Sequence, residues 1–249
     1  MEQNGLFFEE REFGEGLALV GCAPGTTRLL VPARVDGVPV VAVAAEAFMN
    51  NTELIEVTFE EPDEEMWFDL LTFAEIGESA FRGCTSLRRI TAVGNDVSVG
   101  HGAFAGCSKL RTARLGSSVS LSGYAFYECE ALTEISPLYY VGEGALEGCT
   151  SLTHPMLDTC AHEIDEDGFR GCGVVEIFFP ATVSQIGRDA FRSCTSLRRA
   201  TFAATDGWYW ECAYASGKRP LDVSDPVENA VALRTMDFDD GVLWWRREK

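Results

Sequence analysis

The segment IGESAFRGCTSLRRI (76–90) recurs almost unchanged as IGRDAFRSCTSLRRA (186–200). Five further segments share its spacing of small, aromatic, cysteine and leucine positions, and they are VAAEAFMNNTELIEV (43–57), VGHGAFAGCSKLRTA (99–113), LSGYAFYECEALTEI (121–135), VGEGALEGCTSLTHP (141–155) and IDEDGFRGCGVVEI (164–177). The aromatic position advances in steps of 33, 23, 22, 20, 23 and 22 residues, and the first step contains an insertion at about 62–71. A nearly constant period of this length is typical of a repeat architecture, here with seven units.

Each unit predicts one turn of helix followed by a short strand. Cys follows Phe by three positions, which places both side chains on one face of a helical turn. The pattern L-x-x-I-x-apolar then alternates, as at Leu87, Ile90 and Ala92, and predicts a strand. A second alternation, as at Val97 and Val99, leads to the next unit. Because one such unit cannot bury its apolar side alone, we expect the units to stack into a solenoid.

The pattern I-G-x-x-A-F-x-x-C-x-x-L-x-x-I resembles the BspA-like leucine-rich repeat family of bacteria. Residues 16–48 are similar to the opening segment of that family, and residues 207–248 resemble its aromatic-rich end module. The resemblance implies an α/β repeat solenoid, a right-handed leucine-rich-repeat stack with short strands and short helical turns, capped at both ends. We therefore expect N-terminal capping strands in 1–42, seven repeats in 43–205 and an aromatic-rich C-terminal cap in 206–249.

Two columns of side chains form the predicted structural ladder of the stack. Three positions depart from the pattern, since Asn51 replaces Cys, Leu146 replaces Phe, and Pro155 follows His154 where the fifth strand is expected. The ladder consists of Phe81, Phe104, Phe126, Phe169 and Phe191, and of Cys84, Cys107, Cys129, Cys149, Cys172 and Cys194.

The cysteines are expected to be buried free thiols that act as small apolar residues. Stacked repeats hold equivalent side chains about 4.8 Å apart, whereas a disulfide needs Cβ atoms at about 3.8 Å with converging vectors. Free thiols suit a reducing compartment, and the N-terminus has no basic and apolar signal pattern. These features predict a cytoplasmic protein, whereas the family resemblance implies the alternative of a cell-surface or secreted one.

Charge and hydropathy exclude several classes of partner. The 249 residues include 39 acidic and 20 basic side chains, a formal net charge of −19. A surface this acidic repels phosphate backbones, so we expect no nucleic-acid binding. No apolar run approaches the roughly 20 residues that a membrane-spanning helix needs.

The sequence offers no constellation of catalytic or metal-binding residues. The three histidines, His101, His154 and His162, occupy different repeat positions, and neither G-x-S-x-G nor a P-loop occurs. Cysteine spacing does not match a zinc site. We therefore expect neither enzymatic activity nor a cofactor or metal.

Recognition of a partner is the remaining chemistry, and two surfaces could carry it. Residues of the repeat strands that point away from the core include the candidates Arg89, Arg114, Met156, Phe178 and Arg199. The insertion adds Met66, Trp67 and Phe68 beside an acidic run, and these side chains either cover an edge of the stack or form a binding knob.

Tryptophan concentrates at the C-terminal end, at Trp208, Trp210, Trp244 and Trp245. These rings either cap the last repeat or form an aromatic platform for a ligand. The sequence as a whole predicts a non-enzymatic scaffold that binds another protein, and the family resemblance implies adhesion or surface recognition. The alternative is a carbohydrate-binding module that uses the C-terminal aromatic side chains.

Overall fold

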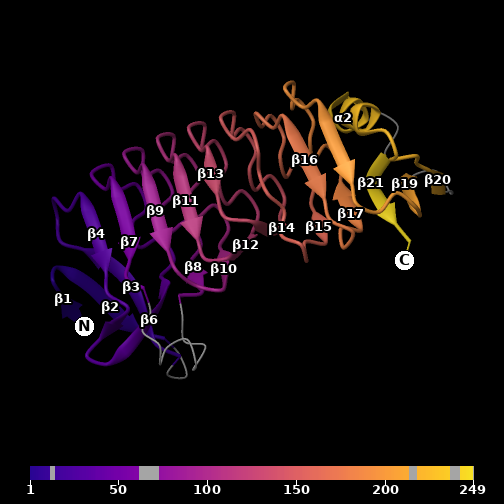
Figure 1. Ribbon diagram of the computed structural model, residues 1–249. Coiled ribbons are helices and arrows are strands. Elements are labelled where there is room, and N and C mark those ends of the chain that lie inside the picture. Colours follow the sequence, from indigo (N-terminus) through magenta and orange to yellow (C-terminus); the bar gives the residue numbers. More distant parts are fainter. Residues whose placement is uncertain (12–14, 62–72, 213–217, 236–241, 249) are drawn as a thin grey trace.

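Stacked coils form an elongated solenoid with the two chain termini at opposite ends (Figure 1). The computed structural model describes residues 1–249 except 12–14, 62–72, 213–217, 236–241 and 249. The predicted solenoid is confirmed by the stacked coils.

Three sheets build the coils. The long sheet has β1 (Glu2–Gln3), β2 (Leu6–Glu10), β3 (Leu17–Cys22), β6 (Val38–Val43), β8 (Glu75–Ile76), β10 (Asp96–Val99), β12 (Ser118–Leu121), β14 (Leu138–Val141), β15 (Glu163–Ile164), β17 (Gln185–Gly187), β21 (Val242–Arg247), β19 (Trp208–Cys212) and β20 (Lys218–Pro220) in spatial order, with β5 (Arg34–Val35) beside β6. A five-stranded sheet contains β4 (Arg28–Val31), β7 (Glu56–Phe59), β9 (Arg89–Ala92), β11 (Thr112–Leu115) and β13 (Glu134–Ile135). The third sheet pairs β16 (Glu176–Phe179) with β18 (Arg199–Phe202).

Equivalent residues of consecutive repeats lie side by side in the sheets. Strands within the repeats pair in parallel, and Arg89 is aligned with Thr112, the residue at its position in the next repeat. Antiparallel strands occur at the two ends, with β1, β2 and β3 at one and β17, β21, β19 and β20 at the other. Alternation in each strand therefore sends one set of side chains into the core and the other set outward.

The A-F-x-x-C segments are turns and not the predicted turns of helix. In one of them the N–H groups of Ser79, Phe81 and Gly83 donate to carbonyls of the next coil, at 2.9, 2.7 and 2.8 Å. The N–H groups between them donate to the carbonyl three residues earlier. Ser79 and Gly83 also have positive φ, 53° and 72°. A continuous helix cannot form, because every second N–H group is used between coils.

Phenylalanine rings stack along the core of the solenoid. The Phe48, Phe81, Phe104 and Phe126 rings follow one another at centroid distances of 5.1, 5.2 and 4.7 Å. Leu146 interrupts the column, and Phe169 and Phe191 then stack at 5.0 Å. All ladder rings are fully buried, so each contributes both burial of a large apolar surface and ring contacts.

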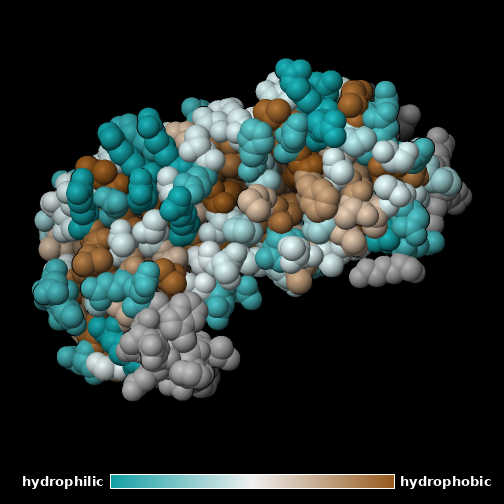
Figure 2. Space-filling view, viewed as in Figure 1, coloured by the Kyte–Doolittle hydropathy of each residue, from teal (hydrophilic) through white to brown (hydrophobic). Residues whose placement is uncertain are grey.

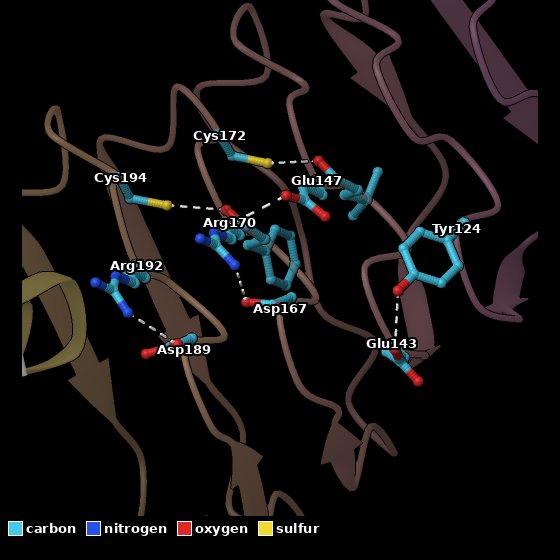
Figure 3. A network of polar contacts seen from close by, with 11 residues as sticks. Tyr124, Glu143, Glu147, Asp167, Arg170, Cys172, Asp189, Arg192 and Cys194 are labelled. Carbon is cyan, nitrogen blue, oxygen red and sulfur yellow. Dashed lines mark hydrogen bonds and ion pairs between the residues drawn. The ribbon is translucent and has the colours of Figure 1, made fainter. Parts of the chain in front are cut away.

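The ladder thiols are hydrogen-bond donors rather than only small apolar groups. Cys107 Sγ donates to the Phe81 carbonyl of the preceding coil at 3.1 Å, and that carbonyl also accepts from Cys84 N–H at 3.0 Å. Figure 3 shows the same bond from Cys172 to the Leu146 carbonyl, at 2.9 Å, and from Cys194 to the Phe169 carbonyl, at 3.0 Å. Burial raises the pKa of the Cys194 thiol, so this donor stays protonated.

The fifth coil interrupts the sheet that the outward strands form. Pro155 is buried at the position that Ile90 and Ala113 occupy in other coils. Proline has no N–H group for the ladder, and residues 153–158 form no strand of this sheet. Their isolated bridge, between Leu157 and Leu138, joins β14 of the long sheet. The five-stranded sheet therefore ends at β13, and a separate sheet begins at β16, as Figure 1 shows.

Helix α2 (Pro226–Thr235) covers the free edge of β18. Asp225 begins the helix, since its Oδ1 accepts from the N–H groups of Val227 and Glu228 at 2.8 and 3.2 Å. Asn229 is buried, and its Nδ2 donates to the Ala200 and Val223 carbonyls at 3.0 and 2.9 Å. The equivalent carbonyl in β11 accepts from the next coil, so Asn229 replaces the missing coil at this edge.

The ring column predicts a large cost for Phe104→Ala. We expect a loss of about 3–5 kcal/mol in the free energy of unfolding, because the substitution leaves a cavity between two stacked rings. Ser98→Ala, at an outward position of β10, should change it by no more than about 0.5 kcal/mol. Urea unfolding followed by circular dichroism measures both, and equal losses would contradict this account of the core.

The thiol bonds predict two classes of cysteine in a titration with a thiol reagent. Exposed Cys160 should react rapidly in native protein, and half-buried Cys22 more slowly. The six buried ladder thiols should react only on unfolding, because burial excludes the reagent. Cys160→Ser should reduce the rapid phase by one thiol. Rapid reaction of several ladder thiols in folded protein would contradict the structure.

The edge of β18 predicts a specific role for the Asn229 amide. Asn229→Ala should lower the free energy of unfolding by about 1–3 kcal/mol, because two buried carbonyls lose their donor. Val231→Ala, at an exposed position of the same helix, should stay within about 0.5 kcal/mol. If chemical denaturation gives the same small effect for both variants, the Asn229 bonds contribute nothing to this edge.

Candidate interaction surface

The outward side chains of β4, β7, β9, β11, β13, β16 and β18 form the outer face of the solenoid. Burial alternates along the four-residue strands of this set, so their first and third residues point outward. Ser136, which the repeat pattern places outward beyond β13, is instead buried and donates to the Gly116 carbonyl at 3.1 Å. In Figure 2 hydrophobic and hydrophilic residues are interspersed over the side of the molecule that carries these sheets.

The charged residues of the outer face pair with one another across coils. Arg89 lies 3.9 Å from a Glu56 carboxylate oxygen, and Arg114 lies 2.6 Å from Glu134. Arg199 lies 3.9 Å from Glu176 in the preceding coil. Exposed pairs of this kind stabilise a fold by only about 0–1 kcal/mol. Their main effect is to leave this part of an acidic protein close to neutral.

Large apolar side chains are exposed at the interruption of the outer face. Met156 is 67% exposed and Phe178 is 56% exposed, and they occupy equivalent positions in consecutive coils. Leu30, 60% exposed, occupies the same column in β4, near the N-terminal end. Both are candidates predicted from the sequence, and the structure places Met156 in the interrupted fifth coil between β13 and β16, and Phe178 on β16.

The candidates in the insertion, Met66, Trp67 and Phe68, lie outside the described residues. The choice between a cover and a binding knob therefore stays a prediction.

The C-terminal tryptophans do not form one open platform. Trp208 and Trp245 are buried, and their rings lie 4.9 and 6.2 Å from the Phe202 ring. Trp208 Nε1 donates to the Ala204 carbonyl at 2.9 Å. Trp244 is half-buried on the other face of β21, where the Arg246 guanidinium lies 5.8 Å from its ring centroid. The two buried rings are unavailable to a ligand.

A network of polar contacts on the turn side was not found from the sequence (Figure 3). Arg170 lies between Asp167 and Glu147, at 3.2 and 3.9 Å, and Arg192 pairs with Asp189 at 3.2 Å. Burial raises the pKa of both Glu147 and Asp167, and Arg170 opposes the shift. A nearby carboxylate adds to it in each case, Asp167 at Glu147 and Asp189 at Asp167. The recurring D-x-F-R spacing at 167–170 and 189–192 was the available signal. The contact of Arg170 with Glu147 links adjacent coils.

Two contacts of aromatic side chains also join adjacent coils. The Tyr124 hydroxyl donates to Glu143 at 2.8 Å, and this bond is the main reason that its pKa is raised. The His162 ring lies against Tyr139 at a centroid distance of 5.2 Å. Within the described ranges, no three or more His, Cys, Asp or Glu side chains are arranged to hold a metal ion.

A groove between β18 and α2 is a further feature that sequence reasoning missed. It has a volume of about 370 Å³ and is lined by Thr195, Leu197, Arg198, Arg199, Val227, Ala230, Val231 and Arg234. The tryptophans of this end predict an aromatic-rich cap, and the helix was missed. Asp225 followed by Pro226 was the missed signal, because Asp favours the N-cap and Pro the first helical position.

Similarity to known proteins is clear at the level of fold and family. No curated protein matches the chain. The profile described as "BspA type Leucine rich repeat region" matches six copies over residues 42–154 and 136–206. A leucine rich cell surface protein from Faecalibacterium prausnitzii is a structural neighbour with TM-score 0.69 and 22% identity, over 91% of this chain and 61% of that one. The chain thus spans less than two thirds of that protein.

A second neighbour is the T. pallidum leucine rich repeat protein, with TM-score 0.56 and 22% identity over 81% of each chain. At such identities the neighbours establish the fold alone. No helix in the described part of the chain is both long and apolar enough to cross a membrane. The repeat profile covers most of the sequence, and the chain belongs to the BspA-type leucine-rich-repeat family.

Proposed function

We propose that this protein is a non-enzymatic scaffold that binds another protein through its outer face. Leucine-rich-repeat proteins of this family are generally interaction scaffolds, and no catalytic family is indicated. The observation that carries the proposal is the exposure of Met156 and Phe178 in consecutive coils. Large apolar side chains on a solvated sheet are costly unless a partner covers them, and such residues often anchor interfaces.

The interruption at Pro155 supports Met156 and Phe178 as the centre of this surface. Apart from Leu30 near the N-terminal end, the other residues of the outer face are small, polar or paired, so their contribution to affinity is small. An apolar centre surrounded by polar pairs is the usual anatomy of a protein–protein interface. Arg89, Arg114 and Arg199 then act at the rim, where they contribute to orientation and association rate.

Adhesion or surface recognition is the biological form that we propose for this binding. The structural neighbour from F. prausnitzii is described as a cell surface protein. The buried, reduced ladder thiols favour the alternative of a reducing compartment, such as the cytoplasm. Fractionation of the native host with an antibody against this chain distinguishes the two locations.

Carbohydrate binding by the C-terminal tryptophans is the less favoured function. Burial of Trp208 and Trp245 favours the role of a C-terminal cap for residues 206–249. A solenoid end needs such a cover, because its last repeat otherwise exposes the core.

The proposal predicts that Met156→Thr with Phe178→Thr abolishes partner capture. Immobilised protein is exposed to host-cell and bacterial surface extracts, and the retained proteins are identified by mass spectrometry. Both side chains are exposed, so the melting temperature should not change appreciably.

Leu30→Thr is the matched control, since it removes an equally exposed apolar side chain from the same column. Proteins retained by wild type and by Leu30→Thr, but not by the double variant, would support the outer-face centre. An identical set retained by all three would contradict it.

A further inference from the structure

The pentapeptide Thr-Ser-Leu-Arg-Arg occurs twice, at 85–89 and at 195–199, in two different surroundings. Both arginine pairs are exposed. Arg89 lies 3.9 Å from Glu56 and Arg199 lies 3.9 Å from Glu176, so even the ion pairs correspond. The first copy is followed by β11 of the next coil, whereas the second is followed by α2. Any binding property that belongs to the second copy alone must therefore come from the helix.

Helix α2 and the second copy of the pentapeptide together line a groove, and the helix supplies its apolar wall. Val227 and Val231 are 50% and 38% exposed, and their spacing places them on one side of the helix, with Ala230 and Arg234 beside them. The Asn229 bonds to Ala200 and Val223 fix the opposite side of the helix on β18. The groove is consequently a rigid feature of the fold, held by buried hydrogen bonds.

The charge of the groove is opposite to that of the whole chain. Its lining contains three arginines and neither Asp nor Glu, in a protein of net charge −19. Among the described residues, no carboxylate lies within ion-pair distance of Arg198, and Glu176 is the single partner of Arg199. Arg234 Nη1 donates to the Thr195 carbonyl at 3.3 Å, which holds this side chain against the groove.

We propose that this groove binds an acidic peptide segment of a partner protein, with an apolar side chain on Val227 and Val231 and carboxylates on Arg198 and Arg199. Guanidinium groups pair bidentately with carboxylates, which gives such a contact direction as well as charge. A volume of about 370 Å³ admits only a few side chains, which suits a short segment rather than a folded domain.

This inference rests on the proposed scaffold function and adds the chemistry of the partner. Arg199 belongs to the outer face and also lines the groove, and its neighbour across the sheet, Glu176, lies two residues from Phe178. A partner seated on Met156 and Phe178 can therefore extend an acidic segment into the groove. A nucleic acid fits less well, since its phosphates continue past three arginines onto an acidic surface.

The test uses random short peptides displayed on phage and selected on the full-length protein. We expect the selected peptides to be rich in Asp and Glu around a Leu, Ile or Phe. A selected peptide labelled with fluorescein is then titrated by anisotropy. Arg198→Gln with Arg199→Gln should raise its Kd by roughly tenfold or more, through the loss of charge-assisted bonds. Added salt should weaken binding to wild type.

Arg88→Gln with Arg111→Gln is the control, because both arginines are exposed, occupy the position of Arg198 in earlier coils and lie outside the groove. It should leave the Kd within about twofold. Equal effects of the two double variants, selection of peptides without acidic residues, insensitivity to salt, or no selected peptide at all would overturn the proposal. Light scattering tests for self-association of the protein. Self-association that disappears in Arg198→Gln with Arg199→Gln would identify a second copy as the occupant of the groove and would also overturn the proposal.

The outcomes separate this inference from the scaffold proposal. In one outcome, Met156→Thr with Phe178→Thr abolishes partner capture and Arg198→Gln with Arg199→Gln leaves it intact. This result supports the outer-face function and rejects the acidic segment. In the opposite outcome, peptide binding depends on the groove arginines, and substitution of Met156 and Phe178 does not change partner capture. This result supports the groove and rejects the apolar centre.

Discussion

In the turn segments of the first six coils, backbone N–H groups donate alternately within their own coil and to the next, and the stack depends on this alternation. This alternation gives hydrogen-bond partners to backbone N–H and carbonyl groups that a single coil would leave unpaired. The Cys thiol adds a further bond between coils. It donates to a Phe carbonyl of the preceding coil that already accepts from an N–H group of its own coil. Coils can therefore be added only in register, which aligns the Phe rings as a consequence.

Regular stacking also limits what the surface can do. Where the period is exact, outward residues of consecutive coils meet and pair, as Arg114 and Glu134 do, and the surface is neutral and solvated. The surface departs from this pattern where the regular stacking is interrupted. Pro155 interrupts the sheet beside Met156 and Phe178, and the last strand meets α2 instead of another coil. The proposed binding surface and the groove both lie at such interruptions.

The two copies of Thr-Ser-Leu-Arg-Arg show how position in the stack creates a difference that local sequence does not contain. Both arginine pairs have the same exposure and the same type of ion pair. Only the copy at the open edge acquires an apolar wall, because Asn229 and α2 satisfy that edge. The helix that covers this edge thus also forms the groove for which we propose peptide binding.

The sequence by itself determined the period, the solenoid, the Phe and Cys columns and the disturbed fifth strand, because a repeated apolar pattern has one way to be buried. It did not determine that A-F-x-x-C is a turn, since the spacing of Phe and Cys fits a helix equally well. Only the tertiary structure decided this, together with the thiol bonds, the buried tryptophans and the groove at α2. Each of these depends on what lies in the neighbouring coil or at the end of the stack, and residue spacing within one unit carries no record of that neighbour.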